Sequence, residues 1–153
     1  MHIDIQPIGT VVGGRVDATD DDWGAVESTI ALDGGVLGAD ATAGLDGFSH
    51  VEVVFVFDRV GDDDIERGAR HPRGRTDWPL VGILAQRAKG RPNRLGVTTC
   101  ALVAVDGLTL RVRGLDAVEG TPVLDVKPYM SGFAPRGVVT EPSWATELME
   151  GYW

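Results

Sequence analysis

Positive charge is concentrated in one stretch of the sequence, from His71 to Gly96. Between Arg67 and Arg94 there are eight Lys and Arg residues and one acid, Asp77, whereas the whole chain has a net charge of -9. Seven glycines and prolines interrupt the stretch, so a long helix is excluded and the cations fall on loops. Guanidinium groups on stiffened loops suit an anion such as a phosphate or a carboxylate, although a solvated basic loop is equally compatible with the pattern.

The composition limits the class of protein. With 153 residues, 43% of them hydrophobic and 24% charged, residues 1–153 should form a single globular domain. No apolar run approaches the roughly 20 residues that cross a bilayer, and no secretion leader opens the chain, so we expect a cytoplasmic protein with no membrane partner. Cys100 is the only cysteine and the three histidines lack helical metal-ligand spacing, so no disulfide and no metal site is expected.

Short strands must position the charged groups. Apolar and polar residues alternate in segments that predict strands over residues 2–12, 26–32, 50–58, 97–105, 108–112 and 123–127. The segment His50–Asp58, apolar on nearly both faces, is the best candidate for a central strand. Asp106-Gly107 favours a type I′ hairpin turn. In the last strand, Leu124 and Val126 should point inward.

Closely spaced strands with little helix predict a mainly β fold, a single-domain antiparallel β-barrel with short helices. One such helix should start at Pro142 and end before Gly151. The glycine clusters at Gly13-Gly14 and at residues 34–38 do not form a GxGxxG motif between a strand and a helix. The sequence therefore argues against a Rossmann cofactor site.

Five blocks of the sequence carry a family resemblance. They are Pro7-Ile8-Gly9, residues 44–50, residues 71–74, Gln86-Arg87 with Arg91-Pro92-Asn93, and residues 115–129. In this order they resemble the TrmO/TsaA-like (YaeB-like) family, whose members are S-adenosylmethionine-dependent tRNA N6-threonylcarbamoyladenosine N6-methyltransferases. The resemblance implies a non-Rossmann β-barrel methyltransferase that acts as a homodimer on the modified adenosine beside the tRNA anticodon. The extra C-terminal domain of longer members is not expected here.

The resemblance also implies a cofactor site for S-adenosylmethionine near the subunit interface. Carried over position by position, the cofactor contacts fall on Trp23, Gly24, Asp58, Arg59, Arg87, Val97, Asp116, Ala117, Val118 and Glu119. Chemically, Asp116 and Glu119 can accept hydrogen bonds from a ribose or an ammonium group, and Arg87 can bind a carboxylate with two hydrogen bonds. A turn-capping aspartate and a surface ion pair are the alternative interpretations of these residues.

Methyl transfer is an in-line displacement, so most of the rate should come from alignment of the acceptor. Asp125, Lys127 and Tyr129 share one outward face of the last strand and are the catalytic candidates that could orient it; an exposed strand edge is the alternative. Substrate phosphates of the tRNA anticodon loop, or a substrate carboxylate, should be bound by Arg73, Arg75, Gln86, Lys89, Arg91, Asn93 and Arg94.

Two of the blocks depart from the family pattern. The usual Ala-Thr-Arg-Ser-Pro is replaced by the sequence of residues 85–89, and Pro-Asn-Pro-Ile-Gly by that of residues 92–96. Because these positions handle substrate and cofactor, two alternatives stay open. The chain could be a methyltransferase for a small metabolite, or a non-catalytic module that binds S-adenosylmethionine or RNA.

Overall fold

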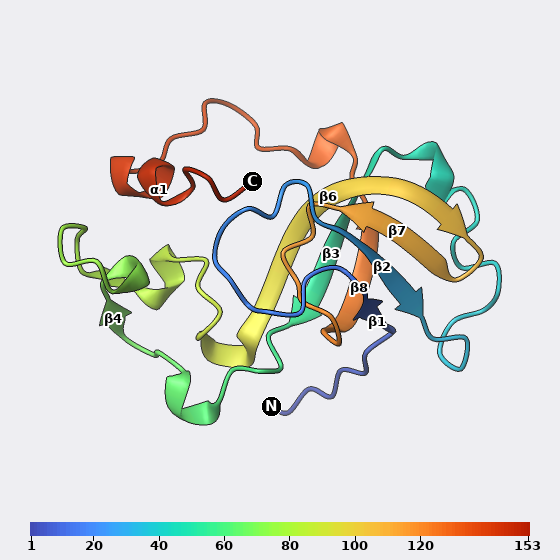
Figure 1. The fold of residues 1–153 in the computed structure, drawn as a ribbon, viewed down its shortest axis with the longest axis horizontal. Helices are drawn as coiled ribbons and strands as arrows, with labels where there is room; N and C mark the ends of the chain where they lie inside the picture. The colour runs from blue at the N-terminus through green and yellow to red at the C-terminus, as the bar shows by residue number, and fades with distance from the viewer.

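The computed structural model describes all 153 residues and is built around a closed antiparallel barrel (Figure 1). Its strands are β1 (Gly9–Val12), β2 (Glu27–Leu32), β3 (His50–Val56), β6 (Leu95–Asp106), β7 (Thr109–Arg113) and β8 (Pro122–Pro128). Around the barrel the order is β1-β2-β7-β6-β3-β8, and pairing of β1 with β8 closes it. The predicted mainly β, antiparallel barrel with short helices is thus confirmed.

The basic stretch lies outside the barrel (Figure 1). It contains a two-stranded sheet of β4 (Ala69–Arg70) and β5 (Val81–Gly82), and the chain ends after the predicted short helix, α1 (Ser143–Leu148). Single 3-10 turns complete the structure at Leu45–Gly47, Asp62–Asp64, Pro72–Gly74, Ile83–Ala85, Pro92–Arg94 and Ser131–Phe133. None of the helices has the length and apolar character needed to span a bilayer.

Alternation of side chains along each strand fills the barrel. In β1, β7 and the first half of β6 every second residue is buried, as period-2 geometry requires. The resulting core consists of Val11, Ile30, Val51, Val53, Phe55, Cys100, Leu110, Val112, Leu115, Ala117 and Val123. Burial of this continuous apolar surface is the main source of the barrel's stability.

The predicted central strand is confirmed. β3 pairs with β6 on one side and with β8 on the other. Its inward side chains Val51, Val53 and Phe55 are at most 1% exposed. A Cβ at Gly96, which pairs with Phe55, would lie only 2.5 Å from the Phe55 ring, so the glycine makes room for the largest core side chain.

Two predicted elements are shorter or shifted. Residues 2–8 lie outside the sheet, and Ile3 and Ile5 are 68% and 61% exposed, because no strand pairs with them. In the β6–β7 hairpin Asp106 pairs with Thr109, so the two-residue loop is Gly107 and the residue after it rather than Asp106-Gly107. Gly107 has a positive φ of 56° at the first loop position, as in a type II′ turn.

The inward positions of β8 also differ from the prediction. The register between β3 and β8 shifts so that Val54 pairs with Asp125 and Phe55 with Val123, which leaves Leu124 as the extra residue of a bulge. Val123 therefore enters the core and is fully buried, whereas Leu124 is only half-buried. Val126 packs against the core, as predicted.

Candidate cofactor and substrate site

The segment after β7 brings Asp116 to the side of β6. The Asp116 carboxylate accepts hydrogen bonds at both oxygens, from the Thr98 hydroxyl on Oδ1 and from the Tyr152 hydroxyl on Oδ2. Asp116 is half-buried between two core residues, Leu115 and Ala117. The backbone of this segment is therefore fixed by the core, and the carboxylate is held by two hydroxyl groups.

The end of β3 meets the same segment through Arg59. The Arg59 guanidinium donates to the Val16 carbonyl over 2.8 Å and to the Glu119 carbonyl over 2.7 Å. Asp58 and Arg59 are both exposed. The structure thus brings together expected cofactor residues that are 60 positions apart in sequence.

A third expected pair, Arg87 and Val97, lies on the same part of β6. Arg87 Nη2 donates to the Val97 carbonyl over 2.5 Å, and the Val97 side chain is 42% exposed. Since Val97 directly precedes Thr98, the contact with Arg87 is next to the contact with Asp116. Three expected cofactor segments therefore converge on the start of β6.

The first loop contributes Trp23 and Gly24, but not as exposed side chains. Trp23 is 3% exposed, its Nε1 donates to the Thr19 carbonyl over 3.1 Å, and the Arg15 guanidinium lies 4.1 Å from its ring centroid. A Cβ at Gly24 would lie 2.6 Å from the carbonyl carbon of Trp153. The segment that follows α1 therefore covers this loop.

The remaining expected cofactor residues have buried side chains. Ala117 and Val118 are 4% and 9% exposed, so neither residue presents much surface to a ligand. The polar groups nearby fit S-adenosylmethionine: Asp116 is an acceptor for ammonium or ribose hydroxyls, and the exposed Arg87 guanidinium is a donor for a carboxylate. No cluster of three His, Cys, Asp or Glu side chains could hold a metal ion.

Two of the three catalytic candidates share the outer face of the barrel with one cofactor candidate, Val97. Val54 of β3 pairs with Val97 on one side and with Asp125 on the other, so these three residues form a row across the outer face of the barrel. Two strand spacings, roughly 10 Å, separate Val97 from Asp125. Lys127 Nζ lies 2.5 Å from the Asp125 carboxylate, and this hydrogen bond raises the pKa of Lys127. Tyr129 directly follows β8 and is half-buried.

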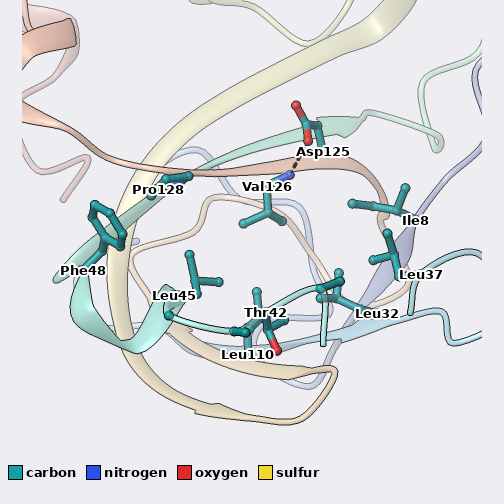
Figure 2. A pocket seen from close by; sticks show the side chains of 13 residues that line it. Ile8, Leu32, Leu37, Thr42, Leu45, Phe48, Leu110, Asp125, Val126 and Pro128 are labelled. Carbon is teal, nitrogen blue, oxygen red and sulfur yellow. Dashed lines mark hydrogen bonds between the residues drawn. The ribbon is translucent and has the colours of Figure 1, made fainter. Parts of the chain in front are cut away.

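A cavity of about 330 Å³ opens on the other side of β8. Figure 2 shows apolar side chains that converge on it from β8 and the loop after β2, including Val126, Leu45 and Leu37, whereas the Asp125 carboxylate points away from them. Apart from Asp125, the cavity is lined by none of the expected site residues. It is thus separate from the polar cluster around Asp116.

Several residues expected to bind substrate are already engaged within the chain. Arg73 forms two hydrogen bonds with Asp21, over 2.8 and 3.2 Å, and this contact raises the pKa of Arg73. Arg75 pairs with Asp77 and lies 3.8 Å from the ring centroid of Trp78. Arg94 pairs with Asp62. These contacts hold the basic stretch in place.

The other expected substrate residues play different structural parts. Gln86 is 8% exposed and its amide donates to the carbonyls of Arg70 and Val81, so it ties the β4–β5 sheet together. Arg91 Nη1 donates to the Gln86 carbonyl over 2.7 Å. Asn93 has a left-handed backbone with φ 65°, and Lys89 is exposed. Of this group, Lys89 is the only charged residue that is exposed, so it is the one best suited to a phosphate.

Four residues of the site were missed by the sequence analysis. Arg15 and Asp21 organise the first loop and bind it to the basic stretch, and Thr98 and Tyr152 hold Asp116. The inward position of Thr98 in an apolar alternating strand was a usable signal, because a buried hydroxyl needs a partner. No pattern pointed to the other three, whose partners are distant in sequence.

The fold is a closed antiparallel barrel, which defines a small β-barrel domain outside the Rossmann class. Near the start of β6 this barrel gathers a carboxylate, two guanidinium groups and main-chain carbonyls. The family model described as tRNA-methyltransferase O N-terminal domain matches residues 21–134. The chain therefore belongs to this family, as the sequence blocks predicted.

Relatives with assigned names agree. The chain is 36% identical over 99 residues to the human tRNA (adenine(37)-N6)-methyltransferase, covering 65% of this chain and 22% of that one. It is 38% identical over 96 residues to the protein of the same name from Escherichia coli K12, with coverage of 60% and 40%. A probable S-adenosyl-L-methionine-binding protein from Methanothermobacter thermautotrophicus is 37% identical over 136 residues, 84% of this chain and 91% of that one.

Solved structures share the fold. A crystal structure of TrmO superposes with a TM-score of 0.73 at 26% identity and covers 92% of this chain and 64% of its own. A crystal structure of TrmO from Pseudomonas aeruginosa gives a TM-score of 0.74 at 24% identity, over 93% and 61% of the two chains. The chain spans about two fifths or less of the human and Escherichia coli relatives that it matches.

Proposed function

We propose that this domain binds S-adenosylmethionine and methylates N6 of the threonylcarbamoyl-modified adenosine next to the tRNA anticodon. The observation that carries the proposal is the convergence of Asp116, Arg59 with Glu119, and Arg87 with Val97 at the start of β6. Family membership and relatives named as tRNA methyltransferases support it. When bound, S-adenosylmethionine supplies the methyl group on a sulfonium centre.

In this proposal the residues of the site have different roles in binding the cofactor and in orienting the methyl acceptor. Asp116 accepts hydrogen bonds from the ammonium or ribose of the cofactor, and Arg87 donates to its carboxylate. Asp125, which lies in the same row as Val97, and Lys127, which is paired with Asp125, orient the acceptor on the outer face. A strong base is unnecessary, because the carbamoyl group already acidifies the N6 proton. Most of the rate then comes from alignment.

Calorimetric titration with S-adenosylmethionine and its demethylated product, S-adenosylhomocysteine, tests the cofactor. We expect binding that weakens at least tenfold in Asp116→Ala and in Arg87→Ala, since each removes a hydrogen bond to a charged group. Arg111→Ala is the matched control, because Arg111 is exposed on β7, has no ion pair and lies between Thr29 and Ala104 on the neighbouring strands, away from the start of β6. Failure of the wild-type chain to bind either compound would reject the proposal.

Mass spectrometry of tRNA from cells with and without the gene tests the substrate. The proposal predicts that the methyl on threonylcarbamoyladenosine is lost without the gene and restored by the wild-type gene. Unchanged tRNA combined with cofactor binding would instead favour a small metabolite as acceptor. That second candidate is supported by the internal pairing of Arg73, Arg75 and Arg94, which leaves fewer free charges for phosphates.

A homodimer is part of the same proposal. Exposed apolar side chains follow β8, with Phe133 82% and Val138 92% exposed, and Val97 on the outer face is 42% exposed. Together with Met130 and Val139, Phe133 and Val138 place four exposed apolar side chains within ten residues, which supports a surface that a second copy of the chain covers. Light scattering should give twice the chain mass for the wild-type protein and one chain mass for Phe133→Asp. A wild-type monomer at micromolar concentration would contradict this part.

A further inference from the structure

Two hydroxyl groups hold the Asp116 carboxylate from different elements. Thr98, on β6, is 6% exposed, and its hydroxyl donates to Oδ1. The Tyr152 hydroxyl, from the segment after α1, donates to Oδ2. The rotamer of Asp116 is therefore fixed at both oxygens before any ligand arrives.

The two hydroxyl donors do not use all the hydrogen-bond acceptor positions of the Asp116 carboxylate. An ionised carboxylate offers about four acceptor positions, so about two remain for a ligand. Asp116 is half-buried, so the residue is not closed off from solvent. Burial, together with the neighbouring Asp116 charge, raises the pKa of Tyr152, so the phenol keeps the proton with which it donates.

Tyr152 is itself held by the first loop. Its carbonyl accepts the Trp23 amide hydrogen bond over 2.8 Å, and the Gly151 carbonyl accepts that of Asp22 over 2.9 Å. The Tyr152 ring packs edge to face with Trp153 at a centroid distance of 4.8 Å. The segment thus connects Trp23 and Asp116, two positions at which the cofactor is expected.

We propose that Tyr152 and Thr98 are positioning residues, which orient the Asp116 carboxylate toward the hydrogen-bond donors of S-adenosylmethionine. The inference rests on the proposed function of the site. Neither residue needs to touch the cofactor, because each acts through Asp116. A carboxylate that is already oriented loses less conformational freedom on binding, which increases affinity.

The test uses the full chain and calorimetric titration with S-adenosylhomocysteine. Tyr152→Phe removes one oxygen and keeps the ring and its main-chain hydrogen bonds, and Thr98→Val keeps the shape of the buried side chain. We expect Kd to rise about tenfold in each variant, the low end of the effect of a hydrogen bond to a charged group. Thr109→Val, on an exposed position of β7, should leave Kd within twofold.

A double-mutant cycle with Asp116→Asn separates positioning from a general structural effect. If Tyr152 acts through the carboxylate, Tyr152→Phe should change Kd by less than twofold in the Asp116→Asn background. An equal loss in both backgrounds, or wild-type Kd in both single variants, overturns the inference. Wild-type protein that binds no S-adenosylhomocysteine rejects the proposed function itself, so the two failures are distinguishable. Circular dichroism checks that each variant is folded. If Tyr152→Phe is unfolded, the Kd of Thr98→Val alone tests the inference.

Discussion

Asp21 and Arg73 bind each other through two hydrogen bonds, over 2.8 and 3.2 Å, although 52 positions separate them in the sequence. Their contact joins the acidic first loop to the basic stretch. Both side chains remain partly exposed, at 41% and 26%. Such a pair contributes little to stability, and it occupies a guanidinium that could otherwise bind a phosphate.

Asp21→Asn should therefore strengthen RNA binding. Release of Arg73 adds about one phosphate contact, so we expect a severalfold lower Kd for a tRNA anticodon stem-loop at low salt and a salt dependence steeper by about 0.7 in log-log slope. Filter binding at several salt concentrations measures both. Asp17→Asn is the control, since it changes the net charge equally at an exposed acid with no ion pair. Equal effects of the two variants would attribute the gain to net charge alone.

Gly96→Ala should destabilise the barrel by roughly 1–3 kcal/mol, the usual cost of overpacking a core. The added Cβ would meet two atoms of the Phe55 ring at 2.5 Å, and Phe55 is 1% exposed, so the ring has little space to move. Urea denaturation measures the free energy of unfolding. At Gly47 a Cβ meets nothing within 4 Å, so Gly47→Ala should be near neutral. Similar values for both variants would contradict the prediction.

Period-2 patterns predicted the fold because burial on one face determines strand identity directly. β3 and β7 follow the predicted alternation, and so does the closed barrel to which they belong. The same pattern failed at Ile3 and Ile5, where a strand needs a partner that alternation cannot supply. It also failed at Leu124, because a bulge changes the inward phase and depends on the neighbouring strand.

The sequence predicted which segments contribute to the site, but it did not predict which residues contact one another there. Local blocks indicated Arg87 and Asp116, and these do contact consecutive residues of β6, Val97 and Thr98. The sequence could not show that Arg73 is paired with a distant acid, since a loop guanidinium has the same local pattern whether it is free or bound. The part played by Tyr152 depends on how the last segment docks on the barrel.

Gly24→Ala should displace the segment that carries Tyr152. An alanine Cβ would lie 2.6 Å from the Trp153 carbonyl carbon, so the segment must shift and the Tyr152 hydroxyl would move from Asp116. We expect the Kd for S-adenosylhomocysteine to rise about as much as in Tyr152→Phe, with little further loss when the two are combined. Gly132→Ala, where a Cβ meets nothing within 4 Å, is the control. Wild-type affinity in Gly24→Ala would refute this coupling.

The titration of Tyr152 should report its contact with Asp116 in the absence of any cofactor. Burial is the main reason for the raised pKa of the phenol, and the Asp116 charge and hydrogen bond add to it. Because the folded-state pKa is raised, this group's contribution to stability is present below about pH 10 and is lost as the pH rises toward the folded-state value. Ultraviolet absorbance of the phenolate can follow it, since Tyr129 is the only other tyrosine. Asp116→Asn should lower the pKa of Tyr152 and leave it above the ordinary value, because burial persists. If the substitution left the titration curve unchanged, Asp116 would not be the partner that holds the phenol.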